Sequence, residues 1–245
     1  MSQKKFLSTI LLVVLIGSVA AAQTRQSAGL SDAQAEAIFA IESGNRSFAK
    51  ADYESALREY RRVPRSARDK YAQALYNIGV CYYELWRTEE AIDFYRQALT
   101  EQHGRYPRAS YALGVALENQ NRLMEAKEAY RQSISASEGE YGPAHYRLGL
   151  LTLMDGDYET AAGCFRKAIA RAGAHVPASH NNLGVVLAHQ GRLIEAGQEF
   201  EIALKQTNGD FDVAAQNLKL CRSILATPTT AQIAALNIAS MSVNQ

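Results

Sequence analysis

The 245-residue sequence has almost no excess charge of either sign. It carries 26 lysines and arginines against 25 aspartates and glutamates, which gives a formal net charge of +1. A protein that binds nucleic acid through its phosphates shows a basic surplus or a basic stripe. We find neither in this sequence, and we therefore expect no nucleic-acid partner.

Motifs that mark enzymes are also missing. The sequence contains no Gly-x-Ser-x-Gly, no His-Glu-x-x-His, no phosphate-binding glycine loop and no Cys-x-x-Cys. We expect no catalytic residues, no cofactor and no enzymatic activity. An enzyme with an unrecognised site remains the alternative from a different functional class.

Cysteine is scarce, with three residues at Cys81, Cys164 and Cys221. An odd number cannot pair completely within one chain, so we interpret all three as small buried apolar residues. His145 and His180 are 35 residues apart, at a position that we expect to be core, and we predict no metal site.

The N-terminal segment has the features of an export signal. Lys4 and Lys5 precede an apolar run over residues 6–20, and small side chains lead up to Ala22. We expect cleavage after Ala22 and a location outside the cytoplasm, either periplasmic or secreted. In the alternative the segment is retained as a membrane anchor, which would be the only contact with a membrane.

The rest of the chain repeats itself with a period of 35 residues. Five alanines keep this spacing: Ala56, Ala91, Ala126, Ala161 and Ala196. An aromatic residue follows each of them by four positions: Tyr60, Tyr95, Tyr130, Phe165 and Phe200. A glycine precedes each alanine by twelve positions: Gly44, Gly79, Gly114, Gly149 and Gly184. A glycine costs about 1 kcal/mol in a helix relative to alanine. Its recurrence therefore indicates close packing between two helices.

These spaced residues, as in Leu-Gly-x-x-Leu at 183–187 and Ala-x-x-x-Phe at 196–200, resemble the tetratricopeptide-repeat (TPR) family. The usual tryptophan near the start of the first helix is absent, and each unit is one residue longer than the usual 34. The resemblance implies an all-α fold, a right-handed α-solenoid of five helix pairs closed by a C-terminal capping helix.

The period divides the chain into segments. We expect a signal peptide or anchor over 1–22, a linker over 23–36, a TPR domain over 37–225 and an uncharged tail over 226–245. The repeats are placed near 37–71, 72–106, 107–141, 142–176 and 177–211, with the capping helix over 212–225.

The connectors between repeats are predicted to be rigid, because glycine ends one helix and proline opens the next. A large apolar residue precedes each new helix and is expected to pin the turn to that helix: Tyr71, Tyr106, Tyr141, Val176 and Phe211. His103 and His175 fall in connectors and are expected to be solvated.

The resemblance also implies a concave groove lined by the first helices. The repeat phase predicts a row of Tyr76, Tyr111 and Tyr146, continued by Asn181. Around this row the same phase places Gln73, Tyr83, Glu84, Arg108, Glu118, Asn119 and His189. Tyrosine offers a flat apolar face and a hydroxyl, which suit an extended peptide or a helix.

Some family members hold a partner's terminal carboxylate with a clamp of asparagines and basic residues. Asn45, Asn77 and Arg108 match three of its positions, whereas Ile41 and Ala112 occupy two others. Because asparagine is common at these positions of the repeat, the match alone does not establish a clamp.

The combined interpretation is an extracytoplasmic scaffold that binds a protein or peptide partner in its groove. A membrane-tethered assembly factor of the cell envelope is the alternative if the N-terminal segment is retained. The partner itself is not identified by the sequence.

Overall fold

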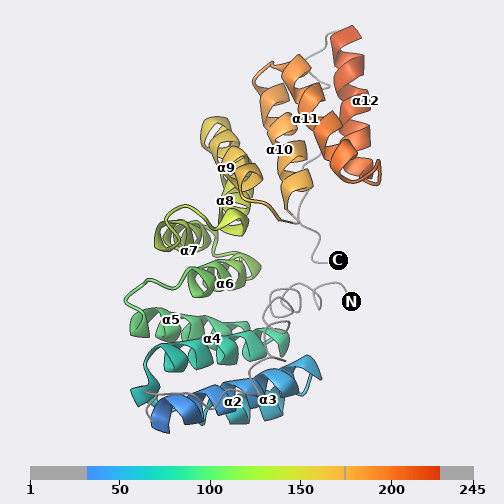
Figure 1. Cartoon of the computed structure of the whole chain (residues 1–245). Helices are drawn as coiled ribbons and strands as arrows, with labels where there is room; N and C mark the ends of the chain where they lie inside the picture. Colours follow the sequence, from blue (N-terminus) through green and yellow to red (C-terminus); the bar gives the residue numbers. More distant parts are fainter. Residues whose placement is uncertain (1–31, 174, 227–245) are drawn as a thin grey trace. The chain divides into compact units, whose positions relative to one another are not determined.

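We describe residues 32–173 and 175–226 from a computed structural model of the chain. These residues form eleven α-helices and one 3₁₀-helix, with no strand among them. The chain divides into two compact units, the first ending at Ala136 and the second beginning at Ser137. Each unit is built from antiparallel helix pairs (Figure 1).

The first unit contains three helix pairs. Its helices are α2 (Asp32–Ala49), α3 (Tyr53–Tyr60), α4 (Asp69–Glu84), α5 (Thr88–Glu101), α6 (Pro107–Asn119) and α7 (Leu123–Ala136), with a 3₁₀-helix, η3 (Arg65–Ala67), between α3 and α4. The first helix of each pair is called the A helix and the second the B helix.

The second unit contains two pairs and one further helix. It comprises α8 (Gly142–Met154), α9 (Tyr158–Ala170), α10 (Val176–His189), α11 (Leu193–Gln206) and α12 (Asp212–Ala226). Helix α12 packs on α11 and α10 through Leu218 and Cys221, which join the buried core around Phe200. It is the capping helix that the sequence predicted, and the fold is the predicted all-α TPR solenoid.

The recurring glycines let an aromatic ring of the B helix lie directly on the A helix. A Cβ atom built on Gly114 would stand 2.5 Å from Cε1 of Tyr130, and one on Gly184 would stand 2.6 Å from Cε1 of Phe200. The same contact occurs at the other three repeats. Any larger residue would push the ring out of the core, so glycine is required by packing.

Helix α3 is shorter than the other B helices because Pro64 follows it. Proline lacks a backbone N–H and its ring collides with the carbonyl of the residue four positions earlier, which here is Tyr60. The helix ends at Tyr60, whereas α5 continues to Glu101. In the other repeats this position carries an aliphatic residue: Leu99, Ile134, Ile169 and Leu204.

The B helices begin in two chemically different ways. The carboxylates of Asp52 and Asp157 accept hydrogen bonds from the backbone N–H of Ser55 and Thr160, at 3.0 and 3.1 Å. The other three helices place an arginine before the helix and a glutamate three positions later, as in Arg192 and Glu195. Both arrangements put a carboxylate beside the first-turn amides, where the helix dipole favours negative charge.

One predicted segment boundary requires correction. Helix α2 begins at Asp32, so residues 32–36 are helical although they were predicted to be part of a linker. Alanine and glutamate favour helix there, and Asp32 stabilises the first turn.

The ring of Tyr106 packs on Tyr76 in α4, with 5.5 Å between centroids. This contact ties its connector to the preceding repeat and was not among the contacts that the sequence predicted.

The predicted signal peptide or anchor over 1–22, the linker up to residue 31 and the tail from residue 227 lie outside the described residues. Among the helices that are described, none is long and apolar enough to cross a membrane.

Candidate protein-binding face

The A helices of each unit lie beside one another and form one face. In the first unit α2 packs on α4 and α4 on α6, and in the second unit α10 packs on α12. No two B helices within the described part of either unit pack as closely. The A helices named here therefore line one side of their unit. We call this side the A-helix face.

Polar side chains bridge neighbouring A helices across this face. In the first unit the Asn77 amide donates to Oδ1 of Asn45 at 3.4 Å, and the Asn119 amide donates to the Tyr83 hydroxyl. In the second unit the Asn217 amide donates to Oδ1 of Asn181 at 2.9 Å. The repeats are therefore joined by hydrogen bonds as well as by apolar packing.

The asparagines of the second unit form a set that was not predicted from the sequence. Asn181, Asn182 and Asn217 are buried, and the Asn181 amide donates to Oδ1 of Asn182 at 3.0 Å. Buried amides without partners would cost free energy, so the network fixes how α12 sits on α10. The signal was present in the sequence, since Asn182 and Asn217 are 35 residues apart.

The predicted tyrosine row is buried. Tyr76, Tyr111 and Tyr146 expose 5%, 2% and 0% of their surface, and Asn181 is buried with them. Each ring packs against the B-helix aromatic of its own repeat, with centroid separations of 5.9 Å, 5.8 Å and 6.1 Å. The prediction that these tyrosines form an open binding surface therefore needs correction, because their rings are drawn into the helix-pair core.

Five of the other predicted groove residues are accessible. Arg108 and Asn119 are exposed on α6, and Tyr83, Glu118 and His189 are half-buried at the C-terminal ends of A helices. The Glu118 carboxylate accepts a hydrogen bond from the Tyr130 hydroxyl at 2.7 Å. The ring of His189 stacks on Tyr158 at 5.1 Å. The side chains of these five residues are the accessible polar groups of the predicted set on the A-helix face.

The asparagines of the possible carboxylate clamp are engaged inside the fold. Oδ1 of Asn45 accepts hydrogen bonds from the Tyr60 hydroxyl at 2.7 Å and from Asn77 at 3.4 Å. Asn77 is buried, whereas Arg108 is exposed. Two of the three matching residues thus serve the packing of α2, α3 and α4.

The histidines divide into buried and exposed groups. Nε2 of His145 lies 3.1 Å from the Gly139 carbonyl, and Nδ1 of His180 lies 2.6 Å from the Glu199 carboxylate. His103 is exposed as predicted. His175 was predicted to be solvated, and this is wrong.

His175 is buried, with Nε2 3.0 Å from the Ala168 carbonyl. Gly142 and Gly173 leave the room that its ring occupies, since a Cβ atom at either position would lie within 3.0 Å of the ring. Burial lowers the pKa of both His145 and His175. Within the described residues no three His, Cys, Asp or Glu side chains gather as metal ligands would.

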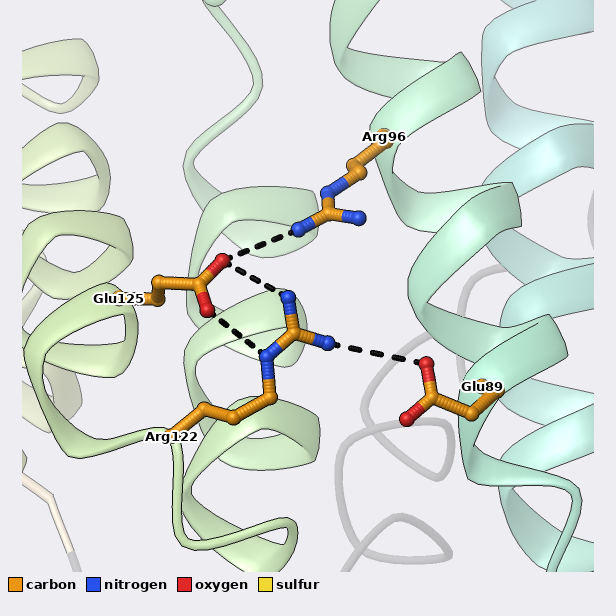
Figure 2. Close-up of polar contacts among 4 residues, drawn as sticks. All are labelled: Glu89, Arg96, Arg122 and Glu125. Atoms are coloured by element: carbon orange, nitrogen blue, oxygen red, sulfur yellow. Dashed lines mark hydrogen bonds and ion pairs between the residues drawn. The ribbon is translucent and has the colours of Figure 1, made fainter.

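The B helices of the first unit are connected by a network of charges. The Arg122 guanidinium contacts Glu125 at 2.8 Å and Glu89 at 3.6 Å, and Arg96 contacts Glu125 at 3.2 Å (Figure 2). The network links α5 to α7 and the turn before it. Solvent screens such exposed pairs, so the network orients these helices more than it stabilises them.

One carboxyl group of the first unit is half-buried without a cation. Glu84 ends α4, and the Tyr53 hydroxyl of α3 hydrogen-bonds to it. Burial raises the pKa of Glu84 to about 7. Burial likewise raises the pKa of the nearby Cys81 thiol. The thiol therefore stays protonated and unreactive.

Tetratricopeptide-repeat sequence profiles match the chain over residues 32–100, 97–143, 111–175 and 146–211. No curated protein sequence matches the chain.

Several solved structures share the fold. MamA from Desulfovibrio magneticus RS-1 is 19% identical, with a TM-score of 0.58, over 74% of this chain and 99% of that one. YrrB, described as a TPR protein with an unusual peptide-binding site, is 22% identical, with a TM-score of 0.58, over 75% and 92%. PilF from Pseudomonas aeruginosa is 17% identical, with a TM-score of 0.61, over 84% and 98%.

At these identities the likeness establishes the fold, and the sequence profiles establish the family. The repeat spacing, the glycine and aromatic packing and the helix pairs agree with both. The chain belongs to the tetratricopeptide-repeat family, whose fold serves as a scaffold for protein–protein interaction.

Proposed function

We propose that this protein is a non-enzymatic scaffold outside the cytoplasm that binds a peptide segment or helix of a partner on its A-helix face. The observation that carries the proposal is the set of accessible polar residues on that face in the first unit, namely Tyr83, Arg108, Glu118 and Asn119. Hydroxyl, amide and charged groups on rigid helices can bind a partner's backbone and side chains without a large ordering cost.

Two further facts support the proposal. The apolar run over residues 6–20 behind two lysines has the composition of an export signal. YrrB, which has the same fold, is described as having a peptide-binding site. Three tyrosines of the predicted row are buried, namely Tyr76, Tyr111 and Tyr146. We therefore expect the partner to contact the accessible residues beside this row.

Affinity capture with the full chain as bait tests the binding face. Partners captured from an envelope or culture-medium fraction should be reduced several-fold by Tyr83→Ala combined with Asn119→Ala. Arg131→Ala is the matched control, because Arg131 is exposed on the B helix α7. Equal recovery with the face variant and the control would refute the assignment of the binding face.

A second measurement tests the location. N-terminal sequencing of the protein from its native cells should find a chain that begins after Ala22. An intact N-terminus in a membrane fraction would instead favour the alternative, a membrane-tethered assembly factor. A cytoplasmic location would refute both.

A further inference from the structure

The Glu84 carboxyl lacks a counter-charge among the described residues. Arg87, three residues further along the chain, pairs with Glu90 at 2.7 Å, and Arg61, an electrostatic neighbour of Cys81, bonds to the Tyr82 hydroxyl at 2.5 Å. The Tyr53 hydroxyl is the one hydrogen-bond donor to Glu84 within the described part of the chain. A half-buried carboxylate in this setting gains more from an incoming cation than a carboxylate in water does.

A buried hydroxyl with no partner lies beside this carboxyl. Tyr95 is fully buried, and among the described residues its hydroxyl has no hydrogen-bond partner. Glu84 and Tyr83 are among its electrostatic neighbours. In the first and third repeats the equivalent hydroxyls, of Tyr60 and Tyr130, are satisfied by Asn45 and Glu118. The second repeat therefore has a spare polar group at the position where its neighbours have an internal bond.

A strained and exposed tryptophan lies two residues beyond Glu84. Trp86 has a φ of 62° and exposes 61% of its surface. At this turn position the other repeats carry small residues: Ala51, Asn121, Gly156 and Gly191. A bulky side chain in the left-handed region is unfavourable, and such strain gathers at functional sites. Tryptophan is also among the residues that most often dominate protein interfaces.

We propose that Tyr53, Tyr83 and Glu84, which we call the Glu84 corner, bind a lysine or arginine side chain of a basic partner segment, with Trp86 packing beside it. This inference rests on the proposed function and adds the chemistry of the partner. The Glu84 carboxylate pairs with the cation, whereas the Tyr95 hydroxyl is fully buried and lies out of the partner's reach. The surrounding tyrosine rings attract positive charge through their faces.

The binding should strengthen as pH rises, because a cation binds the ionised form of Glu84. The other titratable groups around the corner are Tyr53 and Glu54 on α3, Cys81 on α4 and Tyr95 on α5. Burial raises the pKa values of Tyr53, Cys81 and Tyr95, so these groups stay neutral between pH 6 and pH 8. Among Tyr53, Cys81, Glu84 and Tyr95, the ionisation of Glu84 is therefore the one that changes over that range.

Selection from a phage-displayed library of random peptides tests the proposal on the full-length protein. Peptides captured by the wild type should be enriched in lysine or arginine, and Glu84→Gln should remove that enrichment. Glu128→Gln is the matched control, because Glu128 is exposed on the B helix α7. A circular dichroism melt verifies that each variant is folded.

Titration of a selected peptide gives the affinity. Trp86 is the only tryptophan in the chain, so its fluorescence reports binding at this corner. We expect Glu84→Gln to weaken binding about tenfold or more, as for loss of one partner of a desolvated charge pair. The affinity of the wild type should rise between pH 6 and pH 8, and that of Glu84→Gln should not.

The outcomes separate the two proposals. Captured peptides with no basic enrichment, or with acidic enrichment, would overturn the inference about the Glu84 corner and leave the binding face intact. Failure to capture any peptide would count against the proposed function, and the inference would fail with it.

Discussion

Five glycines of the A helices each lie under an aromatic ring from the paired B helix. Two other helical glycines, Gly163 in α9 and Gly197 in α11, have no such neighbour, and a Cβ atom added at Gly163 would meet nothing within 4 Å. Glycine therefore has two roles in the same fold. At the repeat positions it is required by packing, whereas at Gly163 it only lowers helix propensity.

This difference predicts opposite effects of the same substitution. Gly184→Ala should lower the free energy of unfolding by roughly 1–3 kcal/mol, because the new methyl group would overlap the Phe200 ring. Gly163→Ala should raise it by up to about 1 kcal/mol through helix propensity. Urea denaturation followed by circular dichroism measures both. Equal effects of the two variants would show that the glycine contact does not determine the packing.

The Glu84 carboxyl predicts how stability depends on pH between 4.5 and about 7. Its folded pKa of about 7 lies above its ordinary value of 4.5. The group therefore binds its proton more tightly in the folded state, and this stabilisation is lost as pH rises through 7. Glu84→Gln should melt at a higher temperature than the wild type at pH 8, with the gap closing at pH 4.5. A difference in melting temperature that is the same at pH 4.5 and pH 8 would contradict the raised pKa of Glu84.

Each repeat connector is an element with its own packing. In the second unit two histidines tie the connectors to the helices: His145 bonds to the carbonyl of Gly139, and His175 bonds to that of Ala168. Two glycines make room for the His175 ring. The connector before α10 is thus packed around an imidazole, which the glycine and proline pattern did not indicate.

Buried imidazoles make the connectors sensitive to acid. Burial depresses the pKa of His175 below its ordinary value of 6.5. Its contribution to stability is therefore present above pH 6.5 and is lost as pH falls through the folded pKa. The urea midpoint of the wild type should fall between pH 7.5 and pH 5, and His175→Gln should reduce that fall. His103→Gln, at an exposed connector, serves as the control and should leave it unchanged.

Across the whole molecule, stability accumulates through contacts between neighbouring repeats. The last repeat has no following pair, and α12 covers its apolar side with Leu218, Cys221 and Ile224. The same helix supplies the Asn217 amide to the buried Asn181 oxygen. The cap therefore closes both the apolar core and the asparagine network.

Removal of the cap should expose this end of the second unit. A chain ending at Gly209 should melt at a lower temperature than the full chain and self-associate, since Phe200 and Asn181 lose their cover. A chain ending at Ala226 keeps α12 and should match the full chain in both respects. Light scattering and a thermal melt compare the three. If the chain ending at Gly209 has the same melting temperature and light scattering as the chain ending at Ala226, α12 does not act as a cap.

Local residue chemistry, repeated along the chain, was enough to predict the family, the five helix pairs, the capping helix and the close glycine packing. These features recur with a fixed period, so most of them were indicated five times. The shortened α3 was also encoded locally, because a proline in the interior of a helical segment, such as Pro64, ends the helix.

Which side chains face outward depends instead on tertiary contacts. The repeat phase placed Tyr76 in the groove, but its ring packs between Tyr95 and Tyr106, which come from a different helix and a connector. Burial of His175 depends on the space that two glycines leave. The raised pKa of Glu84 depends on its burial where α4 ends beside Tyr53 of α3. Such facts arise from contacts between separate segments, which a periodic pattern does not specify.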